Sequence, residues 1–191
     1  MANTSETGGY LTPTPLALNM TQFLQTVFVG LSGFNGKLVR PKWQAKPPVQ
    51  PDANVNWMAF GVSAQIADAN AFVGMDSNDV TALQRSEYLE VQCSIYGPDS
   101  VENVATIRDG FQISQNLAAL RAAKMGFIES GSAIRTAELV NGQWVDRVEI
   151  QFKLVRQILR VYPILPFISA GGKIQTVLAD GKNTIDWLVE P

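Results

Sequence analysis

The chain has 191 residues, 46% of them hydrophobic and 17% charged, with a formal net charge of −2. The length suits one domain, and the slight acidity argues against nucleic-acid binding as the main task, which normally needs a basic surface. Histidine is absent, which excludes the commonest general base and the usual Ser-His and Cys-His nucleophile pairs. The single cysteine, Cys93, excludes an intrachain disulfide and weakly indicates a reducing compartment. The low charge favours burial of surface in an oligomer.

The N-terminal residues predict an extended arm. Residues 1–15 mix Gly, Pro, Thr and Ser, which suit neither a helix nor a core strand. They also lack the basic residue and apolar core of a signal peptide, and no apolar run approaches the ~20 residues of a membrane helix. We therefore expect a protein made in the cytoplasm, without membrane association.

The first regular element is a helix over 20–32. Apolar residues recur at helical spacing from Leu18 to Leu31, Asn19 with Gln22 forms a capping pair, and Gly33 is suited to end the helix. Residues 37–43 predict a short strand, after which a proline-rich loop follows.

Two longer strands follow. Alternating apolar residues predict strands at 55–66 and 88–96, separated by a polar, irregular stretch over 67–85. Gly97-Pro98 ends the second strand, and an apolar stripe beginning after Asp99 predicts one long helix that reaches about Met125.

The sharpest local signal is Asn141-Gly142, which is typical of a two-residue type I′ turn because both positions tolerate positive φ. The resulting hairpin pairs Val140 with Gln143, Leu139 with Trp144, Ala137 with Asp146 and Arg135 with Val148. Arg135 can then reach Asp146 diagonally. Trp144, so near the tip, cannot be buried by its own domain unless a partner docks there.

The second arm of the hairpin places Val148, Ile150, Phe152 and Leu154 inward. Its alternation slips at Leu154-Val155, which predicts a bulge or bend. We expect a ribbon over 133–154 that leaves the body, with its base bent into the main sheet.

The expected fold is α/β (α+β), with a mixed, largely antiparallel sheet, two main flanking helices and a long protruding hairpin. The expected organisation is an arm over 1–15, a single domain over 16–165 and a C-terminal extension over 166–191. In that extension 165–172 predicts a loop, and 173–181 and 184–191 each fit a short strand.

The motifs predict no catalytic, metal or cofactor site. Gly171-Gly172-Lys173 lacks the spacing of a phosphate loop, and Ser130-Gly131-Ser132 has no histidine partner. Asp76 and Asp79 lack EF-hand spacing, and Cys93 lies on the apolar side of a strand, as a buried thiol does. Trp43 and Trp57 read as core or interface residues.

Charge is unevenly distributed along the chain. Residues 52–109 hold nine acidic residues against Arg85 and Arg108, a net of −7, whereas residues 110–160 hold seven basic and four acidic residues, a net of +3. Either the fold scatters these charges over every face, or opposite flanks carry opposite charge and suit head-to-tail packing in a ring.

Several short motifs occur in the order found in one family. They are Gly8-Gly9-Tyr10-Leu11, Val29-Gly30-Leu31-Ser32-Gly33, Leu38-Val39-Arg40-Pro41-Lys42-Trp43-Gln44 with Pro47-Pro48, Asn56-Trp57, Ser94-Ile95-Tyr96-Gly97-Pro98, Arg108-Asp109-Gly110, Gln115-Asn116, Glu138-Leu139-Val140-Asn141 with Gln143-Trp144, and Arg160-Val161-Tyr162-Pro163. Over residues 8–165 the chain resembles the neck or tail-terminator proteins of tailed bacteriophages, particularly those with contractile tails.

The resemblance implies a structural virion protein of the tail or neck that forms a ring, usually a hexamer. The ring would cap the tail tube, stop its polymerisation and join the tail to the head connector, with DNA passing through the lumen without specific binding. The implied partners are further copies of the chain, the tail tube protein and the head connector or neck protein; sheath binding is left open. We expect contacts to ring or tube at two places. These are the hairpin residues Arg135, Glu138, Asn141, Gly142, Gln143, Trp144 and Asp146, and the arm residues Gly8, Gly9, Tyr10 and Leu11.

Two other classes stay open from the residues alone. One is another head–tail joining, head-completion or tail-tube ring protein. The other is a small-ligand-binding or hydrolytic domain that uses carboxylates, for which Glu87 and Glu90 are the available pair, although strand alternation puts them on opposite faces.

Overall fold

The computed structural model describes residues 8–75, 81–140, 142–164, 170–178 and 181–189. The chain forms two compact units. The larger unit comprises residues 15–72 and 84–159, and the smaller unit comprises residues 1–14, 73–83 and 160–191. Strands β4 (Thr81–Tyr96) and β7 (Gln143–Val161) each contribute residues to both units.

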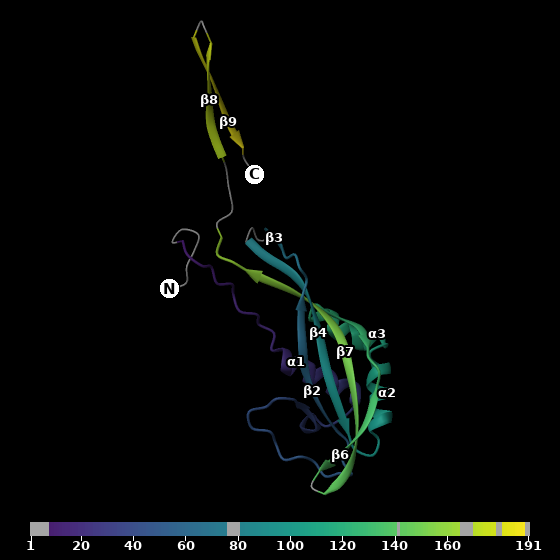
Figure 1. The fold of residues 1–191 in the computed structure, drawn as a ribbon. Helices are drawn as coiled ribbons and strands as arrows, with labels where there is room; N and C mark the ends of the chain where they lie inside the picture. Colours follow the sequence, from purple (N-terminus) through teal and green to yellow (C-terminus); the bar gives the residue numbers. More distant parts are fainter. Residues whose placement is uncertain (1–7, 76–80, 141, 165–169, 179–180, 190–191) are drawn as a thin grey trace. The chain divides into compact units, whose positions relative to one another are not determined.

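A seven-stranded, mixed and mostly antiparallel sheet organises the fold (Figure 1). Its strand order is β1 (Val39–Pro41), β2 (Trp57–Ala67), β4, β7 and β5 (Met125–Ser130); β3 (Phe72–Met75) also pairs with β4, and β6 (Ile134–Val140) with β7. The β1–β2 pair is parallel, whereas β2–β4, β5–β7 and β6–β7 are antiparallel. The predicted α+β class is confirmed.

Helix α1 (Met20–Ser32) has the predicted bounds and caps. The side chain of Asn19 accepts a hydrogen bond from the Gln22 backbone N–H at 3.1 Å, which satisfies one free donor of the first turn. At the other end, Gly33 N–H donates to Val29 O at 3.0 Å. A short 3₁₀ turn, η1 (Gly36–Leu38), then leads into β1, so the strand predicted from residue 37 begins two residues later.

The single helix predicted after Asp99 is wrong, because the structure has two helices, α2 (Ser100–Gly110) and α3 (Ser114–Ala122). At the break, Phe111 is buried and stacks on Phe127 with ring centroids 4.7 Å apart, and the Asn116 side chain donates to Gly110 O at 2.8 Å. The apolar stripe of the sequence continues across the break, so periodicity alone did not locate it. Ile113, which the stripe would place in the core, is exposed.

The hydrophobic core lies between the helices and one face of the sheet. Leu89, Val91, Cys93 and Ile95 of β4 are fully buried, as the alternation predicted. Phe28 of α1 packs near the rings of Phe60, Phe111 and Phe152, at centroid distances of 5.3, 6.2 and 5.9 Å. The opposite face of the sheet, here called the loop face, carries a smaller buried cluster of Trp57, Tyr96 and Val145.

The predicted phase slip in β7 is wrong. Val148, Ile150, Phe152, Leu154 and Ile158 are all buried, so one alternation runs through residue 158 within a continuous strand. The irregularity lies on the partner strand, where the register of β5 shifts between Phe127 and Glu129. Arg156 lies on the same side of β7 as these buried residues, where it pairs with Glu87.

The smaller unit contains β8 (Ala170–Leu178) and β9 (Gly181–Val189), which form an antiparallel two-stranded sheet. The two predicted C-terminal strands are therefore present. The loop predicted over 165–172 is wrong at residues 170–172, which belong to β8, and its residues 165–169 lie outside the described residues. The irregular stretch predicted over 67–85 is wrong in part, since it contains β3 and the start of β4; Asp76 and Asp79 lie outside the described residues. Across the described ranges, no helix is long and apolar enough to cross a membrane.

Candidate functional site

The hairpin formed by β6 and the start of β7 has the predicted register. Val140 pairs with Gln143, Leu139 with Trp144, Ala137 with Asp146 and Arg135 with Val148. Gly142 has a φ of 78°, as a type I′ turn requires, whereas Asn141 lies outside the described residues. The predicted diagonal contact is present, because Arg135 Nη2 lies 3.0 Å from Asp146 Oδ2.

The base of the hairpin is fixed to the sheet at the loop face. Val145 is buried against Trp57 and Tyr96, whose rings stack with centroids 4.1 Å apart. Gly97 N–H donates to Asp146 O at 3.0 Å, which ties the first residues of β7 to the turn after β4. These contacts pack the base of the hairpin against the sheet.

Arg147 organises the charges at the hairpin base. Its guanidinium donates to Glu138 Oε2 at 2.8 Å and to Glu149, and lies 5.6 Å from the centre of the Tyr96 ring. Burial alone would lower the pKa of Arg147, but the hydrogen bonds to Glu149 and Glu138 and the charge interactions with Tyr96 and Glu149 together outweigh it and raise that pKa. For Glu149, burial is the largest single influence and opposes ionisation, but the hydrogen bond and charge of Arg147, together with Lys42 and Ser94, outweigh it and lower the pKa.

The tip of the hairpin exposes two large apolar side chains. Trp144 is 71% exposed and its cross-strand partner Leu139 is 58% exposed. A hollow of about 330 Å³ beside them is lined by Ala53, Pro98, Ala137, Trp144, Val145 and Asp146. An exposed tryptophan paired with leucine at a strand end is a typical protein-contact feature, since burying both removes a large apolar area from water.

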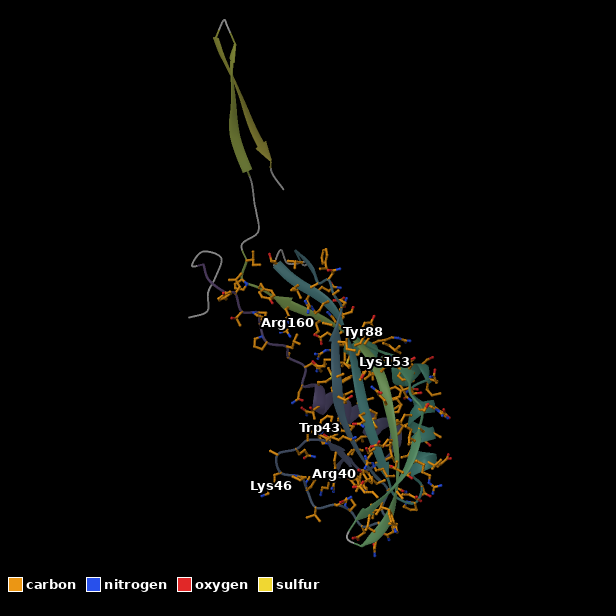
Figure 2. The ribbon with its side chains drawn as sticks, viewed as in Figure 1. Arg40, Trp43, Lys46, Tyr88, Lys153 and Arg160 are labelled. Carbon is orange, nitrogen blue, oxygen red and sulfur yellow. The ribbon has the colours of Figure 1, made fainter. Side chains whose placement is uncertain are left out.

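A second surface lies on the loop face around Trp43, which the sequence left as core or interface. Trp43 is 69% exposed, and its ring lies over Gly61: a Cβ on that glycine would meet Trp43 Cζ3 at 2.4 Å. Arg40 lies 5.5 Å from the Trp57 ring centre, and Arg40 and Trp43, both labelled in Figure 2, line the same groove. The sequence analysis missed this close approach, for which a glycine inside a strand, Gly61, is the available signal.

The groove at this surface measures about 370 Å³ and is lined by aromatic, proline and basic residues, with Glu138 at its hairpin side. Lys42 is one of its lining residues, and burial lowers the pKa of Lys42 despite the attraction of Glu149. Trp57, the other tryptophan of the groove, is almost fully buried, as predicted.

The N-terminal arm belongs to the smaller unit. Gly8 and Gly9 have φ values of 72° and 85°, Tyr10 is exposed and Leu11 is half-buried. Thr14 N–H donates to Val161 O at 3.1 Å, so the arm is tied to the end of β7. The four predicted arm residues are thus at the surface of the smaller unit.

The described residues show no catalytic constellation. Cys93 is buried, and burial raises the pKa of its thiol far above the ordinary value. Glu87, half of the carboxylate pair considered for hydrolysis, accepts hydrogen bonds from Arg156 at 2.7 and 3.0 Å. Within the ranges that the structure covers, no three His, Cys, Asp or Glu side chains are grouped as metal ligands.

Comparison with known proteins identifies the chain over most of its length. Residues 19–185 match the model of the phage neck terminator protein family. No curated protein matches the chain. The match covers the helices, the seven-stranded sheet, the hairpin and β8, and it extends the similarity past residue 165, where the sequence resemblance stopped. The chain therefore belongs to the phage neck terminator protein family, whose members are structural proteins of the region where phage head and tail join.

Proposed function

We propose that the protein is a tail-terminator subunit, which assembles as a ring, hexameric in the family's usual form, on the last ring of the tail tube. The ring stops tube polymerisation and offers its other side to the head connector. In a contractile tail the end of the sheath is a further neighbour. Family membership supports the class of protein, and the exposed residues of the hairpin tip support the proposed contact with the tube.

The observation that carries the contact is the exposed Leu139–Trp144 pair on a hairpin whose base is packed against the sheet. A terminator has to recognise a finished tube end, and a preorganised apolar anchor loses little conformational entropy when it binds. The ion pairs of Arg135 with Asp146 and of Arg147 with Glu138 flank this anchor and supply a polar rim. The arm around Tyr10 is the second proposed contact.

The test uses the tail tube protein polymerising in vitro, with tube lengths measured by negative-stain electron microscopy. Substoichiometric wild-type protein is expected to shorten the tubes and to appear as one ring at a tube end. The double variant Leu139→Ala/Trp144→Ala should lose capping by at least tenfold in the concentration required, because truncating a central aromatic anchor typically costs about 2 kcal/mol or more.

Val101→Ala is the matched control, since Val101 is a similarly exposed apolar side chain on α2. It should cap like the wild type. A protein that leaves tube length unchanged contradicts the terminator role, and one that itself grows into long fibres identifies a tube subunit. Unimpaired capping by the double variant would remove the hairpin tip from the tube contact.

A further inference from the structure

We propose that the β8–β9 hairpin of one subunit adds to the outer edge of β2, at residues 61–67, in the next subunit, and that this strand addition links neighbours around the ring. The inference rests on the proposed ring and names its subunit contact.

The outer edge of β2 is open along most of its length. Strand β1 pairs only with Met58, Ala59 and Phe60, and Lys42 N–H adds one hydrogen bond to Phe60 O. From Gly61 to Ala67, no described strand pairs with this edge, because the only other neighbour of β2 is β4 on its inner side. A strand edge of this length offers a row of backbone donors and acceptors for another chain.

Beyond its bulge, this edge lacks the usual protection. Natural edge strands are blocked by charges, proline or bulges. Strand β1 has Arg40 and Pro41, β5 has Glu129, and β6 has Arg135 and Glu138. Residues 61–67 read GVSAQIA, without a charge or a proline, and the one bulge of β2 lies between Val62 and Ala64. Of these edges, only the segment after the bulge, residues 64–67, has no charge, proline or bulge that would hinder pairing with another strand.

Some backbone N–H and C=O groups of this segment point away from β4, towards the open edge. Asp68 N–H donates to Ser86 O at 3.0 Å, so residue 68 faces β4. Because backbone groups of successive strand residues point to opposite edges, the N–H and C=O of Ala67 and Gln65 point away from β4. Gln65 therefore presents a backbone donor and acceptor, unpaired within the described part of the chain, at the middle of the open edge.

The hairpin has the properties of the strand that would fill this edge. Strands β8 and β9 pair along their full length, from Ala170 with Val189 to Leu178 with Gly181, and the two form a sheet of their own. An isolated two-stranded hairpin is marginally stable in water, so joining a larger sheet stabilises it. Nine residues span about 30 Å and the seven-residue edge about 24 Å, at ~3.4 Å per residue.

The register of the hairpin pairs residues of like character. Ile174 pairs with Ile185, whereas the neighbouring pair is Lys173 with Asp186, and paired residues share a face of a ribbon. Next to the open edge, Ile66 pairs with Tyr88, and both are exposed apolar side chains (Tyr88 is labelled in Figure 2). Strand addition would place a strand of the hairpin directly beside this exposed apolar pair. One donor hairpin and one acceptor edge in each subunit give a heterologous contact that can close into a ring.

The acceptor side is tested with Gln65→Pro. Proline removes the outward N–H, whereas the bonds to β4 are made by the residues on either side. Gln65→Ala keeps the N–H and is the matched control. Sedimentation velocity should show the wild type and Gln65→Ala as a ring, and Gln65→Pro as a monomer with at least a tenfold weaker association. Circular dichroism and thermal unfolding establish that the variant is folded.

The donor side is tested by mixing. Gln175→Pro interrupts β8 and should also be monomeric. Gln65→Pro retains an intact hairpin and Gln175→Pro retains an intact edge, so an equimolar mixture should form a 1:1 dimer and nothing larger. This readout separates a contact between copies from a hairpin that folds onto its own β2, for which the mixture stays monomeric.

Three results overturn the inference: a ring that survives Gln65→Pro, a mixture that stays monomeric, or a wild-type protein that is monomeric.

Should Gln65→Pro unfold, amide hydrogen exchange of the wild type decides. The amides of Gln65 and Ala67 should be protected at ring-forming concentrations and exchange freely on dilution. Equal exchange under both conditions overturns the inference. The tube-capping assay is independent, because a ring that caps tubes but tolerates Gln65→Pro keeps the proposed function and loses only this contact.

Discussion

The ion pair between Glu87 of β4 and Arg156 of β7 should contribute strongly to stability. Both Arg156 Nε and Nη2 donate to Glu87 Oε2, at 3.0 and 2.7 Å, and each side chain is only 13% exposed. Removing one partner of a buried pair leaves an uncompensated charge, which costs about 3–5 kcal/mol when burial is complete. Because some water reaches this pair, we expect Arg156→Met to lower the free energy of unfolding by about 2–4 kcal/mol.

Urea unfolding followed by circular dichroism measures the effect, which corresponds to a midpoint shift of ~1 M for a slope of ~3 kcal/mol/M. The double variant Glu87→Gln/Arg156→Met should recover part of the loss, since no charge is then left unpaired. Lys153→Met is the control: Lys153 pairs with Glu129 at 2.7 Å between β5 and β7, but at the surface, so its midpoint should stay unchanged. Equal effects of the two single variants would refute the argument from burial.

Two further variants test the core and the hairpin base. Phe152→Ala removes a fully buried ring that lies 5.9 Å from Phe28 and 5.1 Å from Phe111, and should destabilise the protein by about 3–5 kcal/mol in the same urea assay; a loss below ~1 kcal/mol would contradict the packing. Glu149, whose folded-state pKa lies below its ordinary value of 4.5, stabilises the fold at pH values above 4.5, and this contribution is lost as the pH falls through the folded-state pKa. Melting temperatures of the wild type and Glu149→Gln should therefore differ at pH 7 and converge towards pH 3, and a constant difference would exclude the linkage.

Local signals in the sequence predicted the elements that depend on local physics. The cap at Asn19, the alternation of β4 and the register set by the hairpin turn each follow from a few neighbouring residues. The break between α2 and α3 depends instead on where the Phe111 ring finds space against Phe127. The break therefore depends on packing in the assembled core, and the apolar periodicity of the sequence, which continues across it, does not indicate where it lies.

The same division applies to the candidate surfaces. The exposure of Trp144 could be predicted because residues at a hairpin tip are not surrounded by the rest of the domain. The position of Trp43 over Gly61 brings together residues from a loop and a strand, and the ion pair of Glu87 with Arg156 joins the acidic and basic segments of the chain within one subunit. Part of the charge asymmetry in the sequence is thus neutralised internally, which a tally along the chain does not reveal.

The burial of Cys93 makes the protein convenient for site-specific labelling. It is the only cysteine of the chain, no part of it is exposed, and its thiol stays protonated at neutral pH because burial raises its pKa. A maleimide dye should therefore react with a cysteine introduced at an exposed position and leave Cys93 untouched. Fluorophores at the hairpin tip or on α2 could then report ring assembly by energy transfer in the otherwise native sequence.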